Sequence, residues 1–258
     1  MKATAVDCHY SIIGSGPALF LTHGIGAAED SWRFITPEIS KHFTVITYDL
    51  RGHGKSHVTN KDFTLDDLVE DLELIRAKTK IEKAYFAGHS LGGMIAPAYA
   101  RKYPQNVISL GLLSTVAGRS ETDTKNVLNV IEAIETYGLE KTLRTLTSRW
   151  FTDEFINNNQ DLVEQRLKQV MDTDLEVFLN VFRLYANTEM SSWLKDISKP
   201  CLLLTGENDL GCSPKHNEFM NKEIKNSKLV ILPKYKHSIL IEAPKEVTKN
   251  LIDFFFKI

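Results

Sequence analysis

The chain has 258 residues, a length that single-domain α/β folds commonly reach and at which a large core needs no disulfides. Its 31 Lys and Arg residues nearly balance its 33 Asp and Glu residues, which argues against a nucleic-acid-binding protein driven by charge. Hydrophobic residues make up 43 % and charged residues 25 % of the chain, so a disordered chain is excluded. No apolar run approaches the roughly 18 residues that a membrane-spanning helix needs.

The start of the chain and the cysteines both favour a cytoplasmic protein. Residues 1–10 contain Asp7 and His9 and no apolar stretch, so no secretory signal is expected. The three cysteines lie far apart and lack the spacing of a zinc site or a disulfide framework. We expect a globular protein without a metal, nucleic-acid or membrane partner. A homo-oligomeric state stays open.

Six short apolar runs predict strands that are buried on both faces of a parallel sheet. They cover residues 18–22, 43–48, 83–87, 107–113, 201–205 and 229–232. Helical patterns lie between them, such as residues 65–75, for which Thr64 is the expected N-cap. A strand, a helix and a strand at this rhythm are typical of βαβ units.

The alternation of strands and helices breaks between residues 118 and 196. This stretch has one internal glycine, Gly138, and no proline, and its apolar residues recur at helical spacing. We therefore expect an α/β core formed by residues 1–117 and 197–258. An all-helical insertion, residues 118–196, would interrupt it.

The strongest local signal of chemistry is Gly88-His89-Ser90-Leu91-Gly92. It fits the pattern G-x-S-x-G, with a strand-like run before it and a helical run after it. Glycine at positions 88 and 92 would remove collisions at a sharp turn that lifts the Ser90 hydroxyl clear of the sheet. The pattern also occurs by chance on ordinary glycine-rich turns. A serine nucleophile additionally requires a base, so that base must be identifiable.

Two residues that follow predicted strands could activate Ser90. His237 comes after the last strand-like run, and Asp209 comes after the run 201–205. Serine, acid and histidine in this chain order are typical of one of the known catalytic-triad architectures. All three lie where open parallel sheets place their sites, at the carboxyl ends of strands. Glu207 is the nearest rival acid, and loop capping is the alternative role for Asp209.

An oxyanion hole would complete such a site with two backbone N–H donors. We assign one to Leu91, directly after the serine, and the other to Ile25. Ile25 lies in His23-Gly24-Ile25-Gly26, where the glycines let the backbone approach a ligand. A plain turn would look similar, but the joint occurrence of loop, serine turn, acid and base argues against chance.

Together these motifs resemble the α/β-hydrolase superfamily and extend over the whole chain. They are His23-Gly24-Ile25-Gly26, Tyr48-Asp49-Leu50-Arg51-Gly52-His53-Gly54-Lys55-Ser56, Gly88-His89-Ser90-Leu91-Gly92-Gly93, Gly206-Glu207-Asn208-Asp209 and His237. Within the superfamily the chain is most similar to the 3-oxoadipate enol-lactonase and carboxylesterase branch, on residues 48–56 and 149–152. The resemblance implies a mostly parallel, eight-stranded sheet flanked by helices, with the helical insertion as a cap.

The site residues predict a serine hydrolase that cleaves a small-molecule carboxylic ester or (enol-)lactone without a metal or organic cofactor. Two alternatives stay open: hydrolysis of a carbon–carbon bond in a vinylogous diketone acid, and a slow-turnover receptor for a small molecule. Candidate substrate-binding residues are Trp32, Arg149, Trp150 and Phe151. The alternatives are solvent exposure for Arg149 and packing for the tryptophans.

Overall fold

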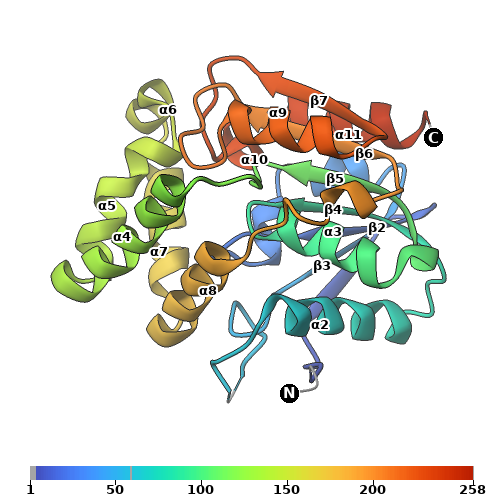
Figure 1. The fold of residues 1–258 in the computed structure, drawn as a ribbon, viewed down its shortest axis with the longest axis horizontal. Helices are drawn as coiled ribbons and strands as arrows, with labels where there is room; N and C mark the ends of the chain where they lie inside the picture. Colours follow the sequence, from blue (N-terminus) through green and yellow to red (C-terminus); the bar gives the residue numbers. More distant parts are fainter. Residues whose placement is uncertain (1–3, 59, 258) are drawn as a thin grey trace.

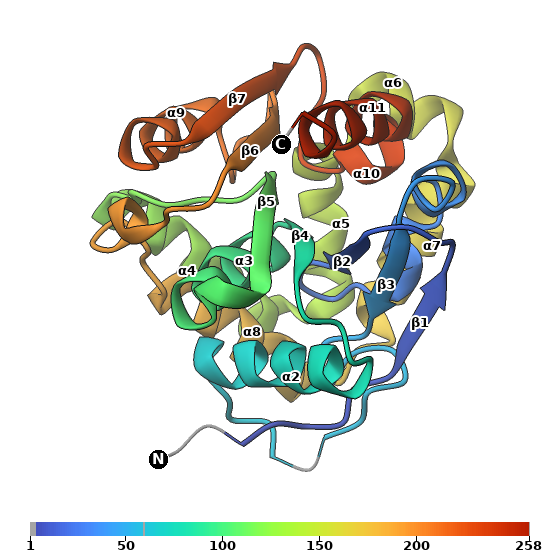
Figure 2. The same ribbon diagram turned by 90° about the vertical axis from the view of Figure 1, so that its right-hand side faces the viewer.

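The structure, a computed structural model, describes residues 4–58 and 60–257. Within these residues seven strands form one sheet in the order β1-β3-β2-β4-β5-β6-β7. Strand β1 runs antiparallel to β3, and the other neighbours pair in parallel. Helices cover both faces of this sheet (Figures 1 and 2).

The elements have the following bounds. The strands are β1 (Tyr10–Ile13), β2 (Ala18–Thr22), β3 (Thr44–Tyr48), β4 (Ala84–His89), β5 (Val107–Leu113), β6 (Cys201–Gly206) and β7 (Ser227–Leu232). The helices beside the sheet are α1 (Thr36–Ile39), α2 (Leu65–Lys78), α3 (Gly92–Lys102), α9 (Pro214–Glu223), α10 (Ile239–Glu242) and α11 (Pro244–Phe255). Between β5 and β6 lie α4 (Glu121–Tyr137), α5 (Leu139–Trp150), α6 (Asp153–Asn158), α7 (Gln160–Met171) and α8 (Leu175–Asn187). Short 3-10 helices are η1 (Glu29–Trp32), η2 (Pro104–Asn106) and η3 (Leu194–Asp196).

The predicted α/β fold with a mostly parallel sheet is confirmed, but the strand number differs from the expected eight. In the described part of the chain the segment before β1 does not extend the sheet. Two of its N–H groups bond to side chains: Val6 N–H donates to Asp71 Oδ1 (2.6 Å) and His9 N–H donates to Ser56 Oγ (2.8 Å). Cys8 N–H donates to the Val6 carbonyl within the segment (2.9 Å). Because α2, a loop and the segment itself satisfy these donors, the segment forms no strand, and its one backbone bond beside the sheet is from Asp49 N–H to the His9 carbonyl (3.0 Å) among the described residues.

The start of α2 shows how local sequence sets an element boundary. The Thr64 hydroxyl accepts the N–H of Asp67 (3.4 Å), and the Asp67 carboxylate accepts the N–H of Thr64 (2.9 Å). These two bonds satisfy backbone donors that the first helical turn leaves free. The predicted N-cap is therefore confirmed.

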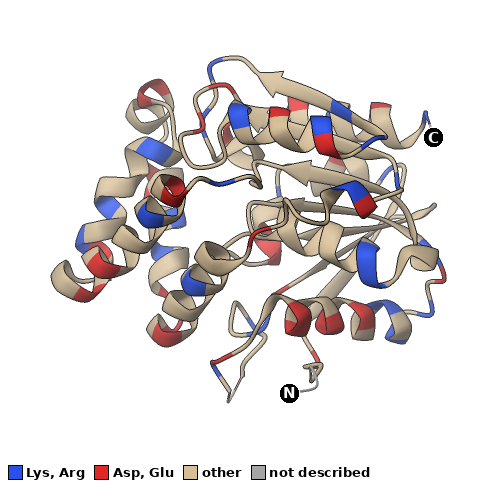
Figure 3. Ribbon diagram, viewed as in Figure 1, with Lys and Arg blue, Asp and Glu red and all other residues tan. Residues whose placement is uncertain are grey.

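The helices α4–α8 gather at one side of the molecule, at the edge toward which the parallel strands point (Figure 1, green to gold). They share a small apolar cluster of their own, made by Ile134, Leu143, Leu167, Val170 and Phe178. Both acidic and basic residues occur along these helices and along those beside the sheet (Figure 3), and the formal net charge is −2. Among the described residues, no helix combines the length and apolar character needed to cross a membrane.

A buried ion pair joins the loop after β3 to α2. Arg51 Nε and Nη2 donate to the two carboxylate oxygens of Asp71, each at 2.6 Å, and the side chains are 6 % and 1 % exposed. Breaking a buried pair by removing one partner costs about 3–5 kcal/mol. Without Asp71, Arg51 would have Asp67 Oδ1, at 3.9 Å, as its remaining carboxylate partner among the described residues. We therefore expect Asp71→Asn to lower the free energy of unfolding by about that amount in urea titrations.

The matched control for this ion pair is Asp66→Asn on the same helix. Asp66 is exposed in the first turn of α2, where a carboxylate contributes only about 0.3–1 kcal/mol. If both variants lost the same small amount, the Arg51–Asp71 pair would not stabilise the fold.

Candidate functional site

Ser90 occupies a strained turn between β4 and α3. Its backbone φ angle is +55°, and the residue is only 8 % exposed. A Cβ at Gly88 would overlap the Gly92 carbonyl, and a Cβ at Gly92 would overlap the carbonyl of Thr22. Glycine is therefore required on both sides of Ser90 for the backbone to turn this tightly.

Asp209 and His237 come together from the ends of β6 and β7. His237 Nδ1 lies 2.7 Å from Asp209 Oδ2, and Asp209 is 2 % exposed. The other carboxylate oxygen accepts the N–H groups of Gly211 (2.9 Å) and Cys212 (2.8 Å). When the ring is neutral and donates its Nδ1 proton to Asp209, its Nε2 atom can accept a proton.

Asp209 and His237 each stabilise the charged form of the other. Burial alone would raise the pKa of Asp209, but the positive charge and hydrogen bond of His237 outweigh it and lower that pKa. Burial alone would lower the pKa of His237, but the Asp209 carboxylate outweighs it and raises that pKa. Asp209 thus stays ionised, and a proton on His237 is stabilised by it.

His89, the second residue of the serine turn, holds the loop that carries His237. Its Nε2 lies 2.9 Å from the His237 carbonyl oxygen, and the two rings are 4.9 Å apart. Burial, aided by the charge of His237, lowers the pKa of His89 to about 3. The neutral ring therefore donates its Nε2–H to this carbonyl. In the sequence His89 occupies a variable position of the motif, so nothing there signalled this contact.

The assigned oxyanion donors are two backbone N–H groups, those of Ile25 and Leu91. Among the described residues, neither the Ile25 N–H nor the Leu91 N–H donates a hydrogen bond. The loop around Ile25 is held from the core side, because Gly26 N–H donates to His53 Nε2 (3.2 Å). Burial lowers the pKa of His53 to about 4, so its ring is neutral and can accept this bond. Ile25 lines the pocket, and Leu91 is fully buried beneath it.

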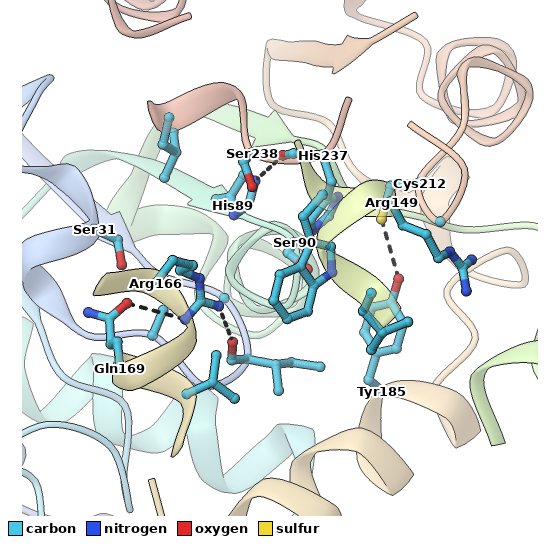
Figure 4. A pocket seen from close by; sticks show the side chains of 18 of the residues that line it. Ser31, His89, Ser90, Arg149, Arg166, Gln169, Tyr185, Cys212, His237 and Ser238 are labelled. Carbon is cyan, nitrogen blue, oxygen red and sulfur yellow. Dashed lines mark hydrogen bonds between the residues drawn. The ribbon is translucent and has the colours of Figure 1, made fainter. Parts of the chain in front are cut away.

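A cavity of about 690 Å³ lies between the sheet and the helices α4–α8 (Figure 4). Ser90, Asp209 and His237 all belong to its lining, as do Arg149 and Trp150. The structure thus brings the predicted serine, acid and histidine to one pocket. A cavity of this size is in the range of small-molecule sites.

Two of the four candidate substrate-binding residues lie elsewhere, and for them the prediction is wrong. Trp32 is fully buried in the core cluster formed with α1 and α11, and Phe151 is fully buried and stacks on Phe155 at 5.3 Å. Neither belongs to the described lining. Sequence position near a loop did not reveal that both aromatic side chains turn into the apolar interior.

The pocket wall also contains residues that the sequence did not single out. The Tyr185 hydroxyl lies 3.3 Å from Cys212 Sγ, and the Arg119 guanidinium lies 4.9 Å from the Tyr185 ring centre. Arg166 of α7 faces the same space (Figure 4). Cys212 follows Asp209 in the same loop. Tyr185, Arg119 and Arg166 belong to no local motif, and only the folding of residues 118–196 over the strand ends brings them to the pocket.

Two groups of side chains in the described ranges have the composition of a metal site. They are Asp209, Cys212 and His237, and His9, Glu29 and Asp49, with ligand atoms within 4.8 Å of one another in each group. In the first group Asp209 and His237 already share a hydrogen bond, and in the second His9 Nε2 lies 3.1 Å from Glu29 Oε1. A bound ion would have to displace these bonds, so we assign no metal to either group.

The fold and this site define an α/β hydrolase. The chain belongs to the alpha/beta hydrolase fold family, whose model matches residues 17–170. It is 28 % identical over 232 residues to 3-oxoadipate enol-lactonase 1 of Acinetobacter baylyi, covering 90 % of this chain and 86 % of that protein. It is 26 % identical to (E)-2-((N-methylformamido)methylene)succinate hydrolase of the same organism, covering 94 % and 92 % of the two chains. The crystal structure of the enol-lactonase from Burkholderia xenovorans superposes with a TM-score of 0.90 at 24 % identity, covering 96 % of each chain.

Proposed function

We propose that this protein is a serine hydrolase that cleaves a small carboxylic ester or (enol-)lactone through an acyl-enzyme. The observation that carries the proposal is the buried Asp209–His237 hydrogen bond in the pocket that Ser90 lines. The similarity to an enol-lactonase over most of the chain favours the lactone within this class. Conversion of an ester or lactone at this site needs no group beyond the side chains and water.

In the acylation step Ser90 Oγ attacks the substrate carbonyl carbon while His237 Nε2 takes the hydroxyl proton. Asp209 stabilises the resulting imidazolium, and the N–H groups of Ile25 and Leu91 bind the oxyanion. The carbon–oxygen bond of the ester then breaks, and the leaving oxygen receives the proton from His237. In a lactone this oxygen remains attached to the acyl chain, so the ring opens.

In the deacylation step a water molecule attacks the acyl-Ser90 carbonyl with His237 again as the base. The oxyanion returns to the same two N–H groups, and collapse releases the carboxylic acid and regenerates Ser90. Residues 118–196 would act as a cap over the core formed by residues 1–117 and 197–258. Arg149 and Trp150 would contact the substrate from this cap, because both line the cavity.

A fluorophosphonate probe with mass spectrometry tests the proposal directly. We expect stoichiometric labelling of the peptide that contains Ser90, together with hydrolysis of p-nitrophenyl acetate and butyrate. Labelling without ester turnover would favour the carbon–carbon bond hydrolase or the receptor over the esterase. Absence of labelling in the folded protein would contradict the assembled triad itself.

A further inference from the structure

A cap arginine reaches the loop that carries one assigned oxyanion donor. Arg166 on α7 donates from Nη2 to the Ile25 carbonyl (2.9 Å) and from Nη1 to the Gly26 carbonyl. Nη1 also lies 3.2 Å from Gln169 Oε1 on the same helix. Figure 4 shows the guanidinium between α7 and this loop, at the wall of the pocket.

Backbone carbonyls and an aromatic ring surround the charge of Arg166. Within the described residues no carboxylate oxygen lies within ion-pairing distance, and the Trp150 ring centre is 5.6 Å away. Burial lowers the pKa of Arg166 to about 10, and Asp30 acts in the opposite direction from farther away. The side chain therefore remains a cation at neutral pH, beside the place where the proposed reaction develops negative charge.

The loop is fixed from two sides. From the core, His23 Nδ1 bonds to the Gly24 carbonyl (2.7 Å) and His53 Nε2 accepts Gly26 N–H. From the helices, Arg166 holds the next two carbonyls. The Ile25 N–H lies between these anchors and has no partner of its own among the described residues.

We propose that Arg166 is a positioning residue that keeps the Ile25 N–H aimed at the oxyanion and adds a positive field there. The inference rests on the proposed function. It makes the oxyanion hole a joint product of the core and the helices α4–α8. The competing role for Arg166 is binding of a substrate carboxylate, since its three hydrogen bonds to described residues leave two of the five guanidinium N–H groups for a ligand.

The test compares Arg166→Met and Arg166→Lys on two esters, p-nitrophenyl acetate and a mono-p-nitrophenyl ester of a dicarboxylic acid. For Arg166→Met we expect kcat to fall by about 10–100-fold on both esters, since a small misplacement of a catalytic group costs up to about 10²-fold. KM should change little, and fluorophosphonate labelling should slow in parallel. Arg166→Lys keeps the charge but lacks the planar fork, so it should recover part of kcat.

The matched control is Arg144→Met on the neighbouring helix α5. Arg144 is half exposed and pairs with Glu140 and Glu164, away from the loop, so both kinetic constants should stay at the wild-type value. A rise in KM confined to the dicarboxylic ester would overturn the positioning role in favour of substrate binding, and so would an unchanged kcat. Should Arg166→Met fail to fold by circular dichroism, the kcat of Arg166→Lys against wild type decides the same question. Absence of labelling in the wild type would instead contradict the proposed function.

Discussion

Replacing Ser90 by alanine is expected to lower kcat for p-nitrophenyl esters by about 10⁵–10⁶-fold, because loss of the nucleophile removes the covalent route altogether. The turn itself should persist, since its shape depends on Gly88 and Gly92 and not on the hydroxyl. Initial rates at saturating ester, measured on enzyme with wild-type circular dichroism, give the comparison.

The control for this variant is Ser31→Ala. Ser31 also lines the pocket, but its hydroxyl donates to the Ala28 carbonyl (2.7 Å) and has no part in the proposed reaction (Figure 4). Its turnover should match the wild type. Turnover by Ser90→Ala at a rate near that of Ser31→Ala would contradict the acyl-enzyme mechanism.

The second large effect is expected from replacing Asp209, the proposed acid of the triad. We expect Asp209→Asn to lower kcat by about 10⁴-fold, because the amide neither stabilises the imidazolium nor enforces the Nδ1–H tautomer of His237. The residual activity should also change its pH dependence. His237 must be neutral to take a proton, so kcat/KM rises with pH through the pKa of His237. Asp209 raises that pKa, so its removal should move the acid limb to lower pH.

A pH–rate profile of Asp209→Asn beside Glu207→Gln measures this shift. Glu207 stands two residues before Asp209, but its carboxylate accepts Lys234 N–H (3.0 Å) at the surface. The Glu207 variant should therefore keep the wild-type profile. An acid limb that moves in Glu207→Gln and not in Asp209→Asn would transfer the role of the acid to Glu207.

The sequence predicted the parts of the fold whose signal is local. Buried parallel strands such as β5 and β6 are continuous apolar runs, and both were expected within a residue of their observed bounds. Strand β1 was missed because it is a four-residue edge strand with three exposed residues, so no buried run marks it. The resemblance implied an eighth strand, but the described residues form seven. The N–H groups of Val6 and His9, before β1, bond to distant side chains, and no local pattern reports such contacts.

The residues of the candidate site also fall into two groups: those that a local motif predicts and those that only tertiary contacts bring to the pocket. Ser90 was predicted from its glycine spacing, and Asp209 and His237 from their place after strands. Arg166 and His89 were missed because their contacts join residues 141 and 148 positions apart. Trp32 and Phe151 were misplaced because an aromatic residue is equally suited to a pocket wall and to a core.

Hydrogen bonds join the helices α4–α8 to the loop around Ile25 and to the segment that follows His237. These bonds limit how freely the helices could be replaced by those of another protein. Ser238 N–H donates to the Trp150 carbonyl (2.9 Å), directly beside His237, and Glu242 accepts both the N–H and the hydroxyl of Thr152. Together with the Arg166 contacts, these bonds join the helices to the core at two places, the Ile25–Gly26 loop and the segment that follows His237. A chimaera that carried this helical segment on another core would need matching loop residues at each attachment, because the segment that lines the pocket also holds the loops around it.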